Sequence, residues 1–134
     1  MTSAEIRSAF PSWTPVIFYD VSYAKPTSDY LLNHYAKWFK GWLGGFGLGK
    51  WKRWWDCDDF ALMYVAGCKV AHAQTLGIDA DSLAVGIFCY THAKGAHAIV
   101  TAFTDEGQIF IEPQTGQRIA LTPQEIQSCF SASF

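Results

Sequence analysis

Residues 56–61, Asp-Cys-Asp-Asp-Phe-Ala, open the segment that decides the fold. Asp56 is a favourable N-cap, and Asp59 stands three residues further on, as in a capping box. The residues of the expected buried face then recur at three- and four-residue steps, namely Phe60, Ala61, Tyr64, Val65, Cys68, Ala71 and His72. Gly77 is well placed as the C-terminal stop. The pattern predicts a helix from about Cys57 to about Leu76 with one buried face.

The chain before this helix is less regular. Three prolines interrupt residues 1–26, which predicts an extended arm with one short strand near residues 16–19. Thr27 or Ser28 can cap a helix, because the apolar residues that follow have helical spacing. Five glycines between positions 41 and 49 predict that regular structure ends there in a loop.

After the helix, the spacing of the apolar residues no longer has the helical period. Residues 83–90, 96–103, 108–111 and 117–121 are predicted strands, because turn-forming residues separate four apolar stretches. Their order predicts an antiparallel meander. Residues 122–125, Thr-Pro-Gln-Glu, predict the start of a last short helix. The prediction is an α+β domain in which the long helix packs on a small antiparallel sheet.

Composition narrows the classes of protein that fit. The chain has 134 residues, of which 50% are hydrophobic, and we expect a single domain. Residues 1–45 form its arm, first helix and the start of the glycine-rich loop, and residues 46–134 form its core. The net charge is −2 and the only basic run is residues 50–53, so we expect no nucleic-acid partner.

Localisation follows from what the sequence lacks. No apolar run approaches the roughly 20 residues that span a bilayer, and the N-terminus has no signal-peptide pattern. We therefore expect no membrane partner, and a chain that is cytoplasmic or released by a route without a signal peptide. The sequence leaves the oligomeric state open.

Cys57 is the candidate reactive group. It stands in the first turn of the predicted helix, where unpaired N–H groups and the helix dipole stabilise a thiolate and an oxyanion. His97 lies in a predicted strand, and Glu112 lies in the next one. Neighbouring antiparallel strands can place a carboxylate beside an imidazole and fix its orientation. The order predicts a nucleophile, a base and an orienting residue.

Three segments together resemble a known family: residues 56–61, residues 95–98 (Gly-Ala-His-Ala) and residues 111–114 (Ile-Glu-Pro-Gln). They resemble papain-like and transglutaminase-like cysteine peptidases, and more narrowly the C-terminal protease domain of the mushroom agglutinin family. The resemblance covers roughly residues 50–121. It implies a papain-like fold and a Cys57–His97–Glu112 triad. The implied reaction is hydrolysis of a peptide or amide bond in a peptide or protein substrate, through a thioester at Cys57.

The oxyanion donor departs from the papain-like pattern. Those enzymes usually place a glutamine about six residues before the cysteine, and here that position is occupied by Trp51. The agglutinin domain is similar in using a tryptophan, which implies that the Trp51 indole, ahead of Trp54 and Trp55, is the donor. Gln114, which follows the Glu-Pro pair, is assigned to the same oxyanion and substrate group.

Asp58 and Asp59 are the second unusual feature, because carboxylates beside a thiol oppose thiolate formation. A bound cation would remove that penalty. The agglutinin domain is calcium-dependent, and the resemblance therefore implies a calcium site at these two aspartates. The hydrolytic chemistry itself requires no cofactor.

Other interpretations stay open. A peptidoglycan amidase or endopeptidase, or a transglutaminase-like acyl transferase, would keep the triad. A catalytically inactive binding module, as a phage or toxin component, would need none of it. Cys57 would then be an ordinary partly buried thiol, and the aspartates only first-turn charges that favour the helix dipole.

Overall fold

The computed structural model describes residues 1–76 and 81–134. The predicted stop at Gly77 lies outside these residues. In chain order the elements are α1 (Ser3–Ser8), β1 (Val16–Ile17), β2 (Tyr23–Ala24), the π-helix η1 (Tyr30–Tyr35), α2 (Ala36–Gly45), α3 (Cys57–Leu76), β3 (Ser82–Leu83), β4 (Val85–His92), β5 (Gly95–Thr104), β6 (Gly107–Glu112), β7 (Gln117–Ile119), α4 (Pro123–Gln127) and β8 (Ser131–Ser133).

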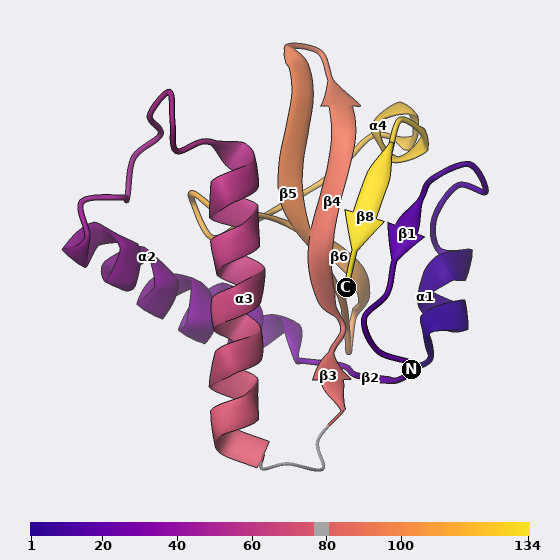
Figure 1. Ribbon diagram of the computed structural model, residues 1–134, viewed down its shortest axis with the longest axis horizontal. Helices are drawn as coiled ribbons and strands as arrows, with labels where there is room; N and C mark the ends of the chain where they lie inside the picture. Colours follow the sequence, from indigo (N-terminus) through magenta and orange to yellow (C-terminus); the bar gives the residue numbers. More distant parts are fainter. Residues whose placement is uncertain (77–80) are drawn as a thin grey trace.

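The main sheet has six strands in the order β1-β8-β4-β5-β6-β7 (Figure 1). Strands β4 to β7 form the predicted antiparallel meander. β8 adds to β4 in antiparallel orientation, and β1 adds to β8 in parallel. The prediction of a small antiparallel sheet is therefore wrong: the sheet is larger and mixed. Of the two added strands, β1 falls within the strand predicted near residues 16–19, whereas β8 has only three residues, too few to show an alternating pattern.

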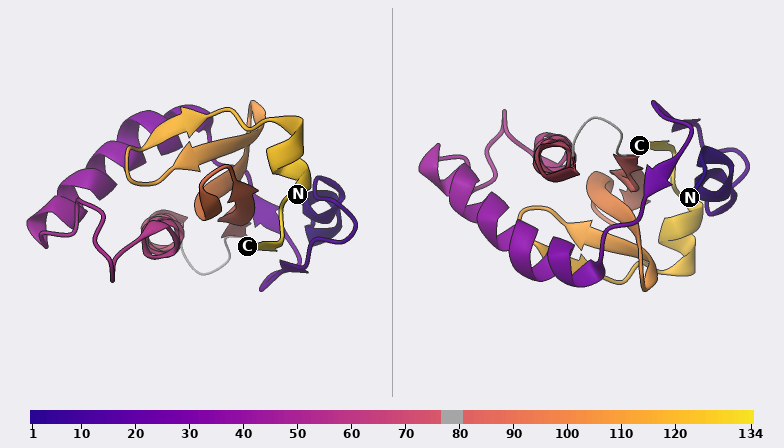
Figure 2. Two further views of the ribbon diagram at one scale, coloured as in Figure 1. Left: turned by 90° about the horizontal axis from the view of Figure 1, so that it is seen from above. Right: turned by 90° about the horizontal axis from the view of Figure 1, so that it is seen from below.

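Each face of the sheet carries its own core. Ala98, Val100 and Ala102 on β5 pack in the cluster that contains the buried face of α3. Ile99 and Phe103 alternate with them and pack in a second cluster with α1, β8 and the C-terminal Phe134. Figures 1 and 2 show α3 along one face of the sheet and α1 beyond β1. The alternation follows from the two-residue period of a strand.

The long helix α3 occupies the predicted residues, Cys57–Leu76. Its start shows one half of the predicted capping box, because the backbone N–H of Asp56 donates to Oδ2 of Asp59 at 3.1 Å. Phe60, Ala61, Tyr64 and Cys68 are buried, which confirms the predicted inner face. Among the described residues, no helix is both long and apolar enough to cross a membrane.

The glycine-rich loop begins later than predicted, because α2 continues through Gly45. Burial of Phe39 and Leu43 stabilises these turns and overrides the low helix propensity of glycine. The helix ends where Gly47 takes a positive φ of 69°, while the N–H of Leu48 donates to the carbonyl of Leu43 at 3.0 Å. This is the glycine stop that helices commonly use.

Two short helices lie outside the longer elements, and only the second was predicted from the sequence. Residues 1–26 were expected to be irregular, yet α1 forms within them, with Thr2 and Glu5 completing a capping box. Only Ile6 of this helix is buried, so it shows no periodic pattern. The second element, α4, confirms the prediction for residues 122–125. Thr122 caps it, and the backbone N–H of Thr122 donates to Oε2 of Glu125 at 2.8 Å.

Candidate functional site

His97 and Glu112 are hydrogen-bonded to each other across two neighbouring strands. The register of β5 and β6 pairs Val100 with Ile111, so the two side chains lie on one face as diagonal neighbours. Nε2 of His97 lies 2.9 Å from Oε2 of Glu112. Because a carboxylate only accepts, Nε2 carries the hydrogen of this bond. The pair has the geometry predicted for an oriented imidazole.

The second carboxylate oxygen of Glu112 is also engaged. The backbone N–H of Gln114 donates to Oε1 at 3.3 Å. Gln114 therefore helps to hold Glu112 through its backbone, and its assignment to the oxyanion and substrate group stays a prediction. With both oxygens bonded, the carboxylate has a fixed orientation toward the histidine.

A polar pocket of about 440 Å³ contains this pair, a volume typical of small-molecule sites, which span about 300–1,000 Å³. The ring centroids of Tyr90 and His97 are 5.8 Å apart, and those of His92 and His97 are 6.1 Å apart. The residues lining the pocket are Tyr90, His92, Lys94, Gly95, Ala96, His97, Glu112, Ile119, Ala120 and Glu125. The pocket thus offers both donors and acceptors within a small space.

Tyr90 is the buried member of this pocket. Burial raises the pKa of its phenol, and the neighbouring Glu125, Glu112 and Cys57 raise it further. The hydroxyl therefore stays protonated at neutral pH. No sequence pattern pointed to Tyr90 or Glu125 as site residues, because Tyr90 belongs to an apolar strand and Glu125 serves in a helix cap. Only the turn at Lys94 and Gly95 marks this end of the sheet in the sequence.

Cys57 is the third predicted residue, and it lies at the start of α3, half-buried against the core cluster on that side of the sheet. It lies near Cys89, whose pKa is raised by burial and by Cys57 and Asp58. Cys89 and Tyr90 are consecutive on β4, so their side chains point to opposite faces. Among the described residues, none that lines the polar pocket comes from α3. The structure joins His97 with Glu112, and the role of Cys57 stays a prediction.

The acidic residues at the start of α3 are arranged differently from the predicted calcium site. Potential ligand atoms of Asp56, Cys57 and Asp58 lie within 4.8 Å of one another, whereas Asp59 accepts from the Asp56 backbone. A hydrogen bond between the Asp56 and Asp58 side chains raises the pKa of Asp58. Calcium takes six to eight oxygen ligands, which two carboxylates and a thiol do not supply. Calcium binding stays a prediction.

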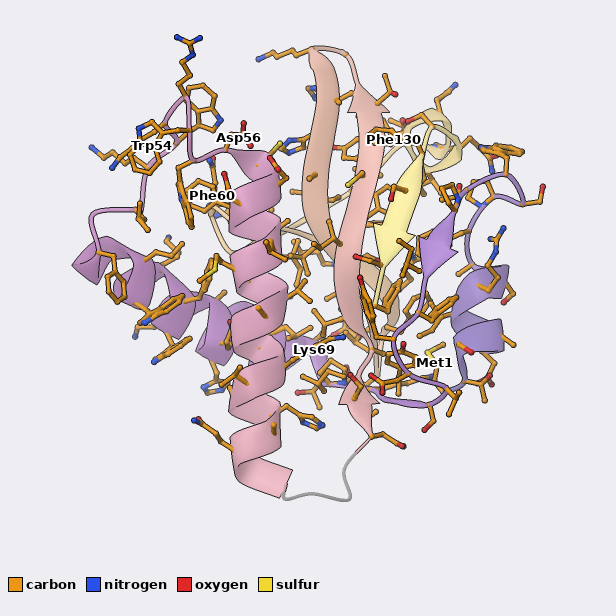
Figure 3. The ribbon with its side chains drawn as sticks, in the orientation of Figure 1. Met1, Trp54, Asp56, Phe60, Lys69 and Phe130 are labelled. Atoms are coloured by element: carbon orange, nitrogen blue, oxygen red, sulfur yellow. The ribbon has the colours of Figure 1, made fainter. Side chains whose placement is uncertain are left out.

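The tryptophans predicted to serve the oxyanion lie in the loop before α3. Trp51 is 60% exposed and Trp54 is 68% exposed, and Figure 3 shows Trp54 on the side of the loop that faces away from the sheet. The Trp55 ring packs edge to face on Phe60 with centroids 5.5 Å apart. Trp55 is therefore a packing residue of this loop, and the donor role of Trp51 stays a prediction.

Two solved structures resemble the whole chain. One, described as a PSL1a-E64 complex, has a TM-score of 0.74 and 18% sequence identity, and the match covers 100% of this chain and 50% of that chain. The other is Polyporus squamosus lectin bound to the human-type influenza-binding epitope Neu5Aca2-6Galb1-4GlcNAc. It has a TM-score of 0.71 and 18% identity, and the match covers 100% of this chain and 49% of that chain. No family model and no curated protein matches the chain.

These findings correct the assignment made from the sequence. Both structures share the fold of this chain, and one of them is named a lectin, so the papain-like fold label is replaced by the fold of these structures, and the comparisons do not support the cysteine peptidase or amidase activity or the hydrolase classification. The ligand named with the second structure is a glycan rather than a peptide. The physical reason for the error is that three short segments in the right order say nothing of the mixed sheet around them. The chain spans about half the length of these two structures.

Proposed function

We propose that this chain is a glycan-binding module and that its polar pocket holds the sugar. The supporting observation is the pocket of about 440 Å³ in which His97, Glu112, Lys94 and Tyr90 line one small space. The likeness to a lectin structure named with a bound glycan supports the same class of ligand. Of the functions that the sequence left open, a binding module fits these observations best.

Sugar hydroxyls both donate and accept, so a sugar site needs partners of both kinds at fixed positions. Glu112 supplies acceptor oxygens that are already oriented by His97 and by the Gln114 N–H. Lys94 supplies a donor, and the buried Tyr90 ring packs against His97 from behind. Because the hydrogen bond between His97 and Glu112 is formed before the ligand arrives, binding costs little side-chain ordering.

The test is isothermal titration of the chain with Neu5Aca2-6Galb1-4GlcNAc and with its asialo disaccharide. We expect Glu112→Gln, which keeps the shape but removes the charge, to weaken binding about tenfold or more, as expected for a lost charge-assisted bond. Glu106→Gln is the matched control, since Glu106 lies outside the pocket and pairs with Arg118. Its affinity should equal that of the parent chain.

Two outcomes would overturn the proposal. One is equal affinity of the parent chain and the Glu112→Gln variant for every glycan that binds. The other is steady turnover of a peptide or amide substrate that Cys57→Ala abolishes, because a binding module forms no covalent intermediate. Circular dichroism of each variant separates lost binding from lost folding.

A further inference from the structure

Residues 30–55 differ in composition from the rest of the chain. They contain five of the six tryptophans and five of the ten basic residues, but none of the twelve acidic residues. The chain as a whole has a net charge of −2, so this segment is a basic, aromatic region of an otherwise acidic protein. Its basic residues are Lys37, Lys40, Lys50, Lys52 and Arg53, of which Lys52 alone is half-buried and the others are exposed.

Aromatic rings follow one side of α2 and continue beyond its end. Trp38, Trp42 and Phe46 are spaced by four residues, which places them on one side of a helix. The indoles of Trp38 and Trp42 stack with centroids 5.6 Å apart and 8° between the planes, and Phe46 meets Trp42 edge to face at 5.5 Å. Trp38 is 51% exposed and Phe46 is 66% exposed. The rings therefore form a ridge that solvent reaches.

A groove of about 680 Å³ lies beside this ridge on the outer side of α2, lined by Asn33, His34, Lys37, Trp38, Gly41 and Trp42. Residues 33, 37 and 41 form the helical row next to the ridge. Gly41 leaves this row open, since a Cβ built there meets nothing within 4 Å. The groove thus has aromatic rings along one side. Along the other side lie an amide, an ammonium group and then the glycine.

One carboxylate stands at the end of the groove. Asp29 accepts from the Asn33 amide at 2.7 Å and lies 3.3 Å from the His34 ring. The lysine farther along the groove, Lys37, has no acidic neighbour on α2, because that helix contains none. The groove therefore keeps a net positive charge toward its Gly41 end.

We propose that this groove binds an acidic polysaccharide, with successive sugar rings lying along the ridge. The C–H groups of a pyranose pack against the negative face of an indole, which suits Trp38. The carboxylate or sulfate of the same sugar then faces Lys37, and its hydroxyls face the Asn33 amide. This site is separate from the polar pocket on β5. It recognises its ligand by electrostatic attraction as well as by shape.

The shape of the groove favours a sugar over other anionic ligands. A membrane surface would contact projecting apolar side chains, whereas this groove is lined by an amide, an imidazole and an ammonium group as well as by indoles. A single-stranded nucleic acid also uses stacking and positive charge. Both are therefore included as competing ligands in the test.

The test is titration of the full chain with oligogalacturonate and with its methyl ester, which has the same sugar backbone without charge. We expect the acid to bind and the ester to bind at least about tenfold more weakly. The difference in affinity should shrink as the salt concentration increases. Trp38→Ala and Lys37→Gln should each weaken binding of the acid about tenfold. Gly41→Met should block the groove, while methionine is a better helix former than glycine.

Matched controls lie on other surfaces. Trp13, 65% exposed, and the exposed Lys25 provide Trp13→Ala and Lys25→Gln, which should bind the acid like the parent chain. Glu112→Gln should also bind it normally, which separates this site from the polar pocket. Equal binding of acid and ester, or unchanged binding by Gly41→Met, would overturn the proposal. A third contradicting outcome is a chain that fails to bind oligogalacturonate but binds oligothymidylate or vesicles containing phosphatidylglycerol, with that binding weakened in Trp38→Ala.

Discussion

The rings of Tyr35 and Tyr64 meet edge to face with centroids 4.9 Å apart, and each phenol donates to a backbone carbonyl at 2.9 Å. The Tyr35 hydroxyl donates to the carbonyl of Tyr64 itself, and the Tyr64 hydroxyl donates to the carbonyl of Leu31. This reciprocal contact fixes the π-helix η1 on α3. Both residues are buried, and burial raises the pKa of each phenol well above its ordinary value, so both remain donors.

Removing either hydroxyl should therefore destabilise the fold. We expect Tyr35→Phe and Tyr64→Phe each to lower the free energy of unfolding by about 0.5–1.5 kcal/mol, because each leaves a buried carbonyl short of a donor. Tyr19→Phe is the control, since Tyr19 is 74% exposed. Urea unfolding measures all three variants, and a loss in Tyr19→Phe as large as in the other two would contradict the prediction.

Gly86 marks the closest approach of β4 to the C-terminus. A Cβ on Gly86 would collide with the backbone oxygen of Ser133 and come within 2.8 Å of the Phe134 ring. We expect Gly86→Ala to cost about 1–3 kcal/mol in unfolding free energy, as overpacking does.

Gly44→Ala is the opposite case, because a Cβ there meets nothing within 4 Å and the residue lies within α2. It should stabilise the chain by about 0.5–1 kcal/mol. Thermal unfolding of both variants gives the comparison. The structural account of Gly86 fails if Gly86→Ala is as stable as the parent chain.

The four free thiols should differ in reactivity. Burial raises the pKa of Cys68 to about 12 and that of Cys129 to about 11, and it also raises the pKa of Cys89. Cys57 is half-buried. Because the thiolate is the reactive form, iodoacetamide at about pH 8 should label Cys57 first and the two fully buried thiols last.

Mass mapping of the adducts against time measures this order, and Cys57→Ala should remove the fast adduct. Labelling in urea provides the control, since all four thiols should then react at similar rates. Fast labelling of Cys68 in the folded chain would contradict the burial seen here.

Ser28 should contribute acid-sensitive stability. Its hydroxyl donates to Glu106 at 2.7 Å and its backbone N–H donates to Asp105 at 2.8 Å, and these bonds lower the pKa of both carboxyls. Groups with a lowered folded-state pKa stabilise the fold above their unfolded pKa values, near 4. That stability is lost as the pH falls through the lowered folded values.

Ser28→Ala should therefore melt below the parent chain at about pH 6, and the gap should narrow as the pH falls through the lowered pKa of the Glu106 carboxyl in the folded parent chain. Ser8→Ala serves as control, because the Ser8 hydroxyl donates to a backbone carbonyl and its effect should not depend on pH. A constant gap for Ser28→Ala across this range would contradict the assignment.

The sequence by itself determined the local elements with strong patterns. The helix from Cys57 to Leu76 follows from its cap and its repeating apolar positions, and α4 follows from its capping box. The meander of β4 to β7 follows from alternation and from the turns between strands. It also identified His97 and Glu112 as partners, because neighbouring antiparallel strands bring such residues together.

Only the tertiary structure decided the rest. α2 runs through its glycines because Phe39 and Leu43 are buried. The strand β8 exists because it pairs with β4, and the predicted strand β1 joins the sheet through β8. Which face of the sheet a side chain occupies depends on register, and this is why the sequence could not place Tyr90 and Glu125 beside His97. Periodicity reports local geometry, whereas pockets form from residues distant in the chain that only packing brings together.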